Sequence, residues 1–240
     1  SIFSFLGIML GVAILIIVMS VMNGFKTELT NKIIGLNPHI VIQPNGFNIN
    51  EKYISKIKNN FKDISLSKTY TGEGVIINSD QAKGIIFKGV NSKEKKIKEF
   101  LEKNIVSGDV KKFKRKNVFI GSELAFDLDL NEGDRINLMS SAFVSTPLGN
   151  LPKQENFYVA GIFNTGFIEF DQNIIFLTTE DALSIFDKDT KDQNLEIYLK
   201  KPLEANSFKR QIEKFNQNYF IYTWSDLNKS FFSALKVERN

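Results

Sequence analysis

The sequence predicts an α+β protein that carries one membrane-spanning helix at its N-terminus. Three observations lead to this prediction. Residues 1–25 contain no charged side chain, so every charge lies in the other 215 positions. After Pro38 the chain changes to short apolar segments separated by polar turns. A strand-helix-strand pattern occurs at both ends of this second part, with a different pattern between the two.

Composition excludes several kinds of functional site. The chain has no Cys and one His, which excludes disulfides, thiolate metal sites and His-rich metal sites. The average values of 42% hydrophobic and 24% charged residues describe an ordinary soluble protein. This average conceals the difference between the uncharged N-terminus and the rest of the chain.

The first predicted element is the membrane helix. Residues 2–22 would form a helix about 32 Å long, enough to cross a hydrocarbon core of about 30 Å. A signal peptide would need a basic start and a cleavage site with small residues, which this segment lacks. Gly7 and Gly11 share one helix face and could let another helix pack closely, although glycine is common in membrane helices. We expect a further segment before Ser1.

Residues 26–37 are predicted to continue this helix out of the membrane as a stalk. Apolar residues recur at every fourth position from Phe25, with charged residues between them. Gly35 and Pro38 mark the predicted end of the helix.

Residues 38–104 and 191–224 are predicted to form one split α+β domain of the ferredoxin-like type. Each part contributes a strand-helix-strand sequence, with helices at 51–61 and after Pro202. The first part also contains a strand pair joined by a turn at residues 78–81.

Residues 105–190 are predicted to be an inserted β-rich subdomain. It has strands near 133–140, 156–163 and 173–178, and two short helices capped by Ser122 and Thr179.

A loop at residues 142–154 is predicted within the insert. Pro147, Gly149 and Pro152 argue against regular structure there. The same segment also carries apolar residues that a solvated loop would not need, namely Phe143, Val144, Leu148 and Leu151. Such side chains either pack against the parent domain or face a partner, and the sequence leaves both possibilities open.

Residues 225–240 are predicted to form a helix that starts with Ser225 or Asp226 as its cap. Its apolar residues lie on one face, so we interpret it as a return stalk toward a second membrane span beyond residue 240.

We find no catalytic or metal site in the sequence. No phosphate-binding G-x-x-x-x-G-K-[ST] motif occurs. Glu169 and Asp171 would lie on the same side of a strand, but a surface pair is the simpler interpretation because no nucleophile accompanies them. His39 is interpreted as a structural imidazole. The basic runs at 93–99 and 111–116 are interpreted as solvated loops rather than as a nucleic-acid or lipid site.

Five separated blocks, in order along nearly the whole chain, resemble one protein family. They read VMSVMNGFKTEL, IIGLNPHI, NVFIGSELAFDLDLNEGDRINLMS, STPLGNLPKQENFYVAGIFNTGFIEFDQNIIFL and TWSDLNKSFFSALKVER. The family is that of the LolC/LolE membrane subunits of the lipoprotein-releasing ABC transporter. The resemblance implies a MacB-like periplasmic domain on the bacterial inner membrane. Whether the subunit is of LolC, LolE or hybrid type stays open.

The resemblance also implies several partners. ATP and magnesium would bind a separate LolD-type subunit, which agrees with the absence of a P-loop and makes this chain a permease without cofactor of its own. A second LolC/LolE-type subunit, or a second copy, would complete the membrane part. The substrate would be a lipoprotein, received by a periplasmic carrier of the LolA type.

The TPxGxxP block resembles the LolC-type hook that recruits this carrier. The residues expected to bind the carrier are Phe143, Pro147, Leu148, Gly149, Leu151 and Pro152. Those expected to border the lipoprotein cavity are Val18, Val21, Met22 and Phe25. The alternatives are a MacB-type exporter, or a membrane-anchored sensor or enzyme with an external domain.

Overall fold

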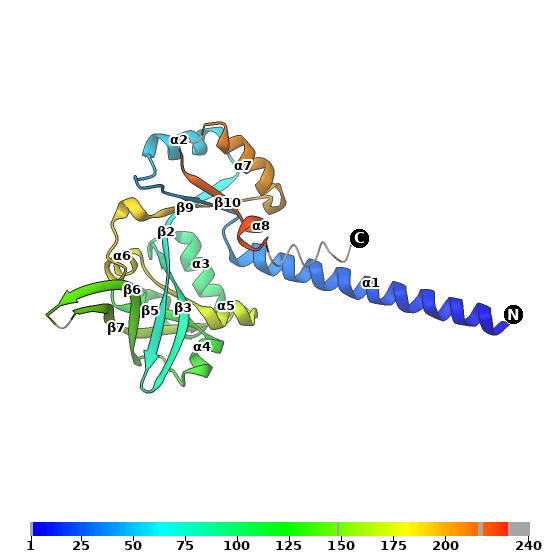
Figure 1. Cartoon of the computed structure of the whole chain (residues 1–240), viewed down its shortest axis with the longest axis horizontal. Coiled ribbons are helices and arrows are strands. Elements are labelled where there is room, and N and C mark those ends of the chain that lie inside the picture. Colours follow the sequence, from blue (N-terminus) through cyan, green and yellow to red (C-terminus); the bar gives the residue numbers. More distant parts are fainter. Residues whose placement is uncertain (1, 148, 216–217, 230–240) are drawn as a thin grey trace.

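The structure is a computed structural model that describes residues 2–147, 149–215 and 218–229. The chain begins with one continuous helix, α1 (Ile2–Leu36), which projects from a compact body (Figure 1). Its segment Phe3–Gly24 is long and apolar enough to span a membrane, with a mean hydropathy of 2.8. The helix ends two residues before Pro38, as the sequence predicts.

The part of the body nearest the end of α1 is an α+β unit. Its four strands are antiparallel in the order β10-β1-β9-β2, with helices α2 and α7 packed on one face. This is the strand order of a split β-α-β fold of the ferredoxin type, as predicted. The elements are β1 (Ile40–Gln43), α2 (Glu51–Asn60), β2 (Ile64–Asn78), β9 (Asn194–Leu199), α7 (Ala205–Glu213) and β10 (Phe220–Thr223).

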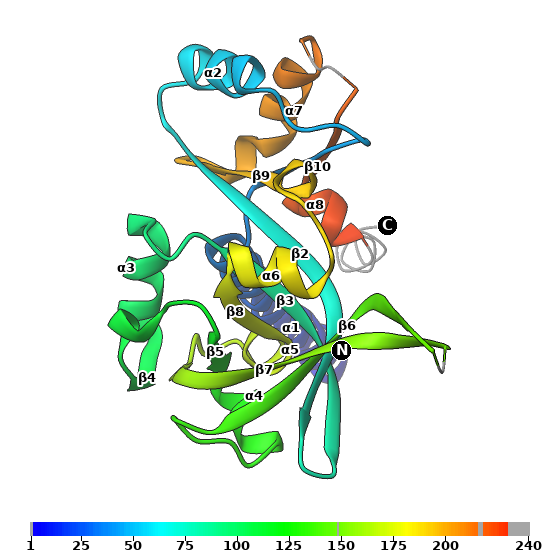
Figure 2. The same cartoon turned by 90° about the vertical axis from the view of Figure 1, so that its left-hand side faces the viewer.

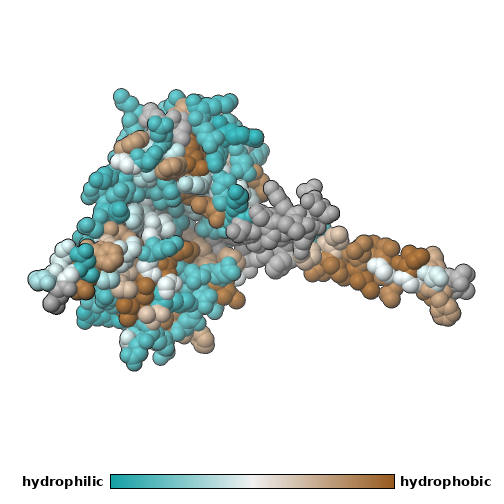
Figure 3. All heavy atoms as spheres, in the orientation of Figure 1, coloured by the Kyte–Doolittle hydropathy of each residue, from teal (hydrophilic) through white to brown (hydrophobic). Residues whose placement is uncertain are grey.

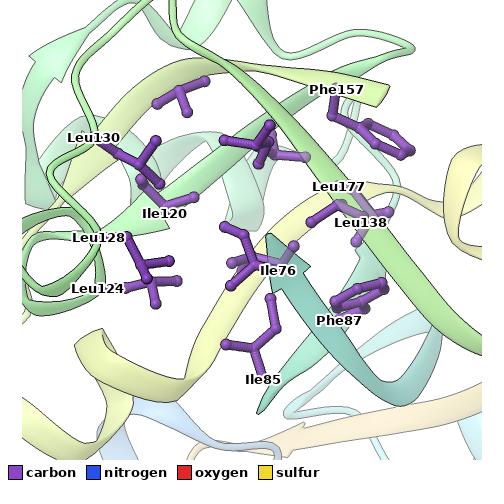
Figure 4. Close-up of a cluster of buried hydrophobic side chains, with 14 of the residues drawn as sticks. Ile76, Ile85, Phe87, Ile120, Leu124, Leu128, Leu130, Leu138, Phe157 and Leu177 are labelled. Atoms are coloured by element: carbon purple, nitrogen blue, oxygen red, sulfur yellow. The ribbon is translucent and has the colours of Figure 1, made fainter. Parts of the chain in front are cut away.

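The second part of the body is a closed barrel. Strand β2 pairs with β3, β3 with β8, β8 with β5, β5 with β7, β7 with β6, and β6 again with β2. Each of these strands contributes buried apolar residues to one interior core (Figure 4). The additional barrel strands are β3 (Gln81–Val90), β5 (Asn117–Gly121), β6 (Arg135–Thr146), β7 (Gly149–Phe163) and β8 (Ile174–Thr178).

Short elements surround this barrel. Strand β4 (Ile105–Gly108) extends the sheet at β7, and α3 (Lys95–Asn104) packs outside the barrel through Ile97 and Leu101. The remaining helices are α4 (Ser122–Asp127), α5 (Ile168–Asn173), α6 (Thr179–Ile185) and α8 (Trp224–Leu227). The interpretation of the basic run at 93–99 as a loop is wrong, because residues 95–99 belong to α3. Charged residues outnumber the two buried apolar residues of this helix, Ile97 and Leu101, so its helical spacing is hard to recognise in the sequence.

Strand β2 connects the two parts. Its first half pairs with β9 in the α+β unit, and its second half pairs with β3 and β6 in the barrel (Figure 2). The pair β2 and β3, which we expected within residues 38–104 of the α+β domain, therefore contributes two barrel strands. The turn between them closes with Asn78 opposite Gln81, at the predicted position.

The prediction of irregular structure at residues 142–154 is wrong. Strands β6 and β7 continue through this segment as a hairpin, with Phe143 opposite Pro152 and Thr146 opposite Gly149. The prolines fit because Pro147 lies in the turn and Pro152 lies in a two-stranded extension, where a missing amide donor costs little.

The prediction that Glu169 and Asp171 lie on a strand is also wrong, because both belong to α5. Asp171 is buried and accepts hydrogen bonds from the backbone N–H and the hydroxyl of Thr165, at 2.9 and 2.7 Å. The side chain therefore anchors the turn before α5.

Three predicted helix caps are displaced. Gly121 and Thr178 occupy the cap positions expected for Ser122 and Thr179. Thr223 caps α8 in a reciprocal capping box with Asp226, in place of Ser225 or Asp226. The expected return stalk lies mostly at residues 230–240, outside the described residues.

Candidate functional site

The tip of the β6–β7 hairpin presents apolar side chains on both of its faces. Directly paired residues share a face, and neighbours along a strand alternate. Phe143 and Pro152 therefore lie on one face, while Val144 and Leu151 lie on the other. Phe143, Val144 and Leu151 are 63%, 46% and 52% exposed, and both prolines are exposed too. The segment is thus a protruding two-sided apolar surface, which we call the hairpin tip (residues 143–152).

The hairpin tip projects away from the membrane helix. It lies at the end of the molecule opposite the N-terminus of α1 (Figure 1). The surface view shows the predominantly apolar helix at one end and a mostly hydrophilic body at the other (Figure 3). The tip therefore extends into solvent on the side of the body opposite the apolar segment of α1.

Short polar contacts shape the turn of the hairpin tip. The Ser145 hydroxyl donates to Asn150 Oδ1, and the Thr146 hydroxyl donates to the Gly149 carbonyl, both at 2.8 Å. Gly149 has a φ of +118°, a conformation that disfavours any other residue. Leu148 lies outside the described residues.

The root of the hairpin is fixed to α6. Lys153 Nζ donates to the Ser184 carbonyl, and the Ser140 hydroxyl donates to the Ile185 carbonyl at 2.6 Å. A register shift between Met139 and Phe143 separates this root from the tip. The hairpin is therefore a rigidly mounted projection with an exposed end, rather than a loop tucked against its domain.

The predicted residues of α1 lie far from the hairpin tip. Val18 and Val21 are exposed, and Met22 is half-buried. Phe25 lies in α1, but its side chain is outside the described structure. Gly7 and Gly11 have open space around the position of an added Cβ, so a second helix could approach them. The two sets of predicted residues therefore form separate surfaces at opposite ends of the molecule.

The structure also shows a buried charged cluster that the sequence reasoning missed. Lys88 Nζ on β3 lies 3.2 Å from Glu196 Oε1 on β9, with side chains only 10% and 5% exposed. The Tyr198 hydroxyl donates to Glu196 Oε2 at 2.7 Å, and the Ser67 hydroxyl donates to Glu94 Oε2 at the same distance. The pair Lys88–Glu196 joins the barrel to the α+β unit.

The environment of this cluster shifts several pKa values. Partial desolvation lowers the pKa of Lys96, which is otherwise an exposed residue, to about 8, although Glu196 opposes this shift. The Lys96 ammonium lies 2.9 Å from the centroid of the Tyr198 ring. Burial raises the pKa of Tyr198, and the charge of Glu196 raises it further. Burial also raises the pKa of Glu94.

The cluster is adjacent to the base of the stalk. Its small cavity of about 40 Å³ is lined by Gly35 of α1 together with Lys88, Glu94, Lys96 and others. His39, which follows α1, accepts a hydrogen bond at Nδ1 from the Leu199 N–H at 2.7 Å. The available sequence signal for this joint was a charged residue next to apolar ones within a predicted strand, as at Lys88 in IIFKGV and Glu196 in LEIYL.

The apolar helix and the two-part body place this chain in the class of membrane-associated proteins with an extramembrane α+β domain. Residues 1–215 match the family model described as the MacB-like periplasmic core domain, and the chain belongs to this family. The fold expected from the sequence is thereby confirmed.

Curated relatives agree with this family over nearly the whole chain. The lipoprotein-releasing system transmembrane protein LolC of Buchnera aphidicola (subspecies Schizaphis graminum) is 30% identical over 99% of this chain. LolC of Neisseria meningitidis is 25% identical over 98%, and LolE of Haemophilus influenzae is 24% identical over 92%. The chain spans 59%, 58% and 55% of the lengths of these three relatives.

Among solved structures, the periplasmic region of MacB from Actinobacillus actinomycetemcomitans aligns with a TM-score of 0.48 and 10% identity. The alignment covers 84% of this chain and 95% of that one. Family membership rests on the family model and on the relatives described above.

Proposed function

We propose that the chain is part of a LolC-like membrane subunit of a lipoprotein-releasing ABC transporter, and that its hairpin tip docks a periplasmic carrier of the LolA type. The main support is the hairpin tip itself. A rigid root, exposed apolar pairs on both faces and a direction away from the membrane helix suit capture of a soluble partner.

A carrier must be docked before release because acyl chains cannot enter water at low cost. Each buried CH₂ group is worth about 0.8 kcal/mol, so exposure of whole acyl chains would stop the transfer. Phe143 and Leu151 would be anchors, one on each face, and Leu148 is proposed to add a third. Pro147 and Pro152 would lower the entropy cost of ordering the tip on binding.

The outer end of α1 is proposed to border the lipoprotein site. Val18 and Val21 are exposed on this helix, and the flexible Met22 suits variable acyl chains. Phe25 follows Met22 by three residues, so it continues the helical spacing of these apolar residues. Gly7 and Gly11 are proposed to pack against another helix of the transporter.

Energy would come from ATP and magnesium bound by a separate LolD-type subunit. The chain itself contains no P-loop motif. A second LolC/LolE-type subunit, or a second copy of this one, would complete the membrane part. We place the assembly in the bacterial inner membrane, with the body in the periplasm, and treat the chain as a non-enzymatic permease subunit.

Substitution of one anchor on each face tests the docking proposal. Phe143→Asp and Leu151→Asp should each weaken carrier binding by about tenfold or more, because each places a charge in an apolar contact. Ala82→Asp, at an exposed position of β3 next to the β2–β3 turn, is the control with the same added charge. Unchanged carrier affinity in both hairpin variants, measured by titration, would remove the hairpin tip from the docking site.

The same experiment addresses the MacB-type alternative. Such an exporter would be expected to associate with an outer-membrane tunnel instead of a soluble carrier. Co-purification with a tunnel protein that depended on Phe143 and Leu151 would favour the exporter.

A further inference from the structure

An unpaired strand edge lies beside a cleft between the two parts of the body. Between Ile64 and Thr69, β2 pairs only with β9, and from Tyr70 onward it pairs instead with β3, on its other side. The first part of β2 therefore has an edge along which no described strand runs. Edges of this kind are usually paired, covered or protected by charge in folded proteins.

The strand register shows which backbone groups this edge presents. The Lys200 N–H donates to the Asp63 carbonyl, so Asp63 and every second residue after it point toward β9. Ile64, Leu66 and Lys68 therefore direct their N–H and C=O groups to the opposite edge. These groups lie on the same side of β2 as the backbone groups that pair with β3 from Tyr70 onward.

The cleft around this edge has a volume of about 650 Å³ and lies between the α+β unit and the barrel. The side chains of Ile64, Leu66 and Lys68 line it, as do Ile54 of α2 and Leu183 of α6. Figure 2 shows β2 passing from the α+β unit into the barrel with α6 beside it. Ligand sites favour such interfaces between subdomains, and 650 Å³ falls within their usual size range.

A buried hydroxyl in the cleft also lacks a partner. Thr179 is 6% exposed and lines the cleft, and its Oγ1 has no hydrogen-bond partner among the described residues. The hydroxyl is enclosed in the wall of the cleft, where its hydrogen-bonding capacity is unused.

The charges of the cleft favour an uncharged occupant. Lys58 and Lys68 line it together with Glu94 and Glu180, so neither sign predominates. A charged ligand of either sign would therefore meet two like charges there. The apolar floor and the free backbone groups suit an extended peptide with apolar residues at alternate positions.

We propose that this cleft binds an extended, uncharged segment of a separate polypeptide, which adds as a strand to the free edge of β2 at Ile64, Leu66 and Lys68. The free edge is about 13 Å long, which accommodates about five residues. The site lies apart from the hairpin tip and does not depend on the carrier-docking function.

The test uses a fluorescent peptide, acetyl-Ser-Val-Thr-Val-Thr-Val-Ser amide, and the full chain in detergent micelles. Strand addition uses the amides of alternate residues only. Two methylated peptides are compared, one with all Val amides and one with all Thr amides N-methylated. One of the two should bind about tenfold or more weakly than the unmodified peptide, and the other should differ from it less than threefold.

Two protein variants locate the binding. Leu66→Pro removes a backbone donor from the free edge and leaves the bonds to β9 in place, so it should weaken binding about tenfold, whereas Leu66→Ala should retain more of it. Should Leu66→Pro fail to fold, the methylated peptides still decide the question because they leave the protein unchanged.

Three results would overturn the proposal. These are no saturable binding of the unmodified peptide, equal loss with both methylated sets, or full binding by folded Leu66→Pro. Self-association of the chain that the peptide dissolves would also contradict it, because a second copy would then occupy the cleft.

Discussion

The buried pair of Lys88 and Glu196 allows a quantitative prediction about the joint between the two parts of the body. Removal of one member leaves the other charge desolvated, which costs about 3–5 kcal/mol in buried pairs. For a chain of this size, that loss corresponds to a decrease in Tm of about 6–20 °C. Glu196→Gln should be the more severe change, because it leaves Lys88 and Lys96 facing only Glu94.

Lys88→Met should be milder than Glu196→Gln. Glu196 would retain the hydrogen bond from the Tyr198 hydroxyl and the nearby charge of Lys96. The double variant Lys88→Met/Glu196→Leu should recover to within about 1 kcal/mol of the natural chain, because no buried charge of the pair remains.

Thermal unfolding followed by circular dichroism and by the fluorescence of Trp224, the chain's single tryptophan, measures these effects. Lys95→Met is the control, because the exposed pair Lys95–Glu99 should contribute less than about 1 kcal/mol. A loss below 1 kcal/mol in both single variants would refute the account of a desolvated joint. A double variant no more stable than the singles would refute the coupling.

Two further predictions concern packing and pH. Gly121→Ala should destabilise the chain by about 1–3 kcal/mol, because the added Cβ would lie 2.0 Å from the Asp171 carbonyl oxygen. Gly84→Ala is the control and should be neutral, because the space around Gly84 is open. Chemical denaturation of both variants measures the difference, and equal stabilities would contradict the tight contact. Stability should rise from about pH 7.5 to about pH 9.5, because in this range the unfolded chain keeps a proton that native Lys96, with its pKa of about 8, releases. Lys96→Met should flatten that rise, and an identical pH profile in the variant would refute the assignment to Lys96.

The sequence predicted elements well where local patterns were strong. The uncharged segment gave the length of the membrane helix, and the amphipathic spacing of residues 51–61 gave α2 to within one residue. The strand-helix-strand pattern at both ends gave the ferredoxin-like strand order. In these segments, hydrophobic periodicity and chain breakers agree with the final packing.

The sequence failed where long-range pairing outweighs local preference. Two prolines and a glycine suggested a loop at 142–154, but pairing across the hairpin retains extended structure there. Asp171 resembled a surface residue because its partner Thr165 becomes available only when the turn before α5 forms. The Lys88–Glu196 joint requires β3 and β9 to meet, although they lie more than a hundred residues apart.

For the candidate site, the sequence supplied the apolar residues of the hairpin but not their arrangement. The division of Phe143 and Pro152 from Val144 and Leu151 follows from the register of β6 and β7. The free edge of β2 was not visible in the sequence, because it depends on where β3 stops pairing.

Photo-crosslinking from the hairpin tip tests the central claim most directly. A photoreactive phenylalanine analogue would replace Leu151 in the full-length subunit within cells, with the exposed Lys188 as the control position. The account predicts that position 151 captures a soluble periplasmic lipoprotein carrier and that position 188 does not. Capture of an outer-membrane tunnel protein at position 151, or no capture of the carrier there, would contradict it.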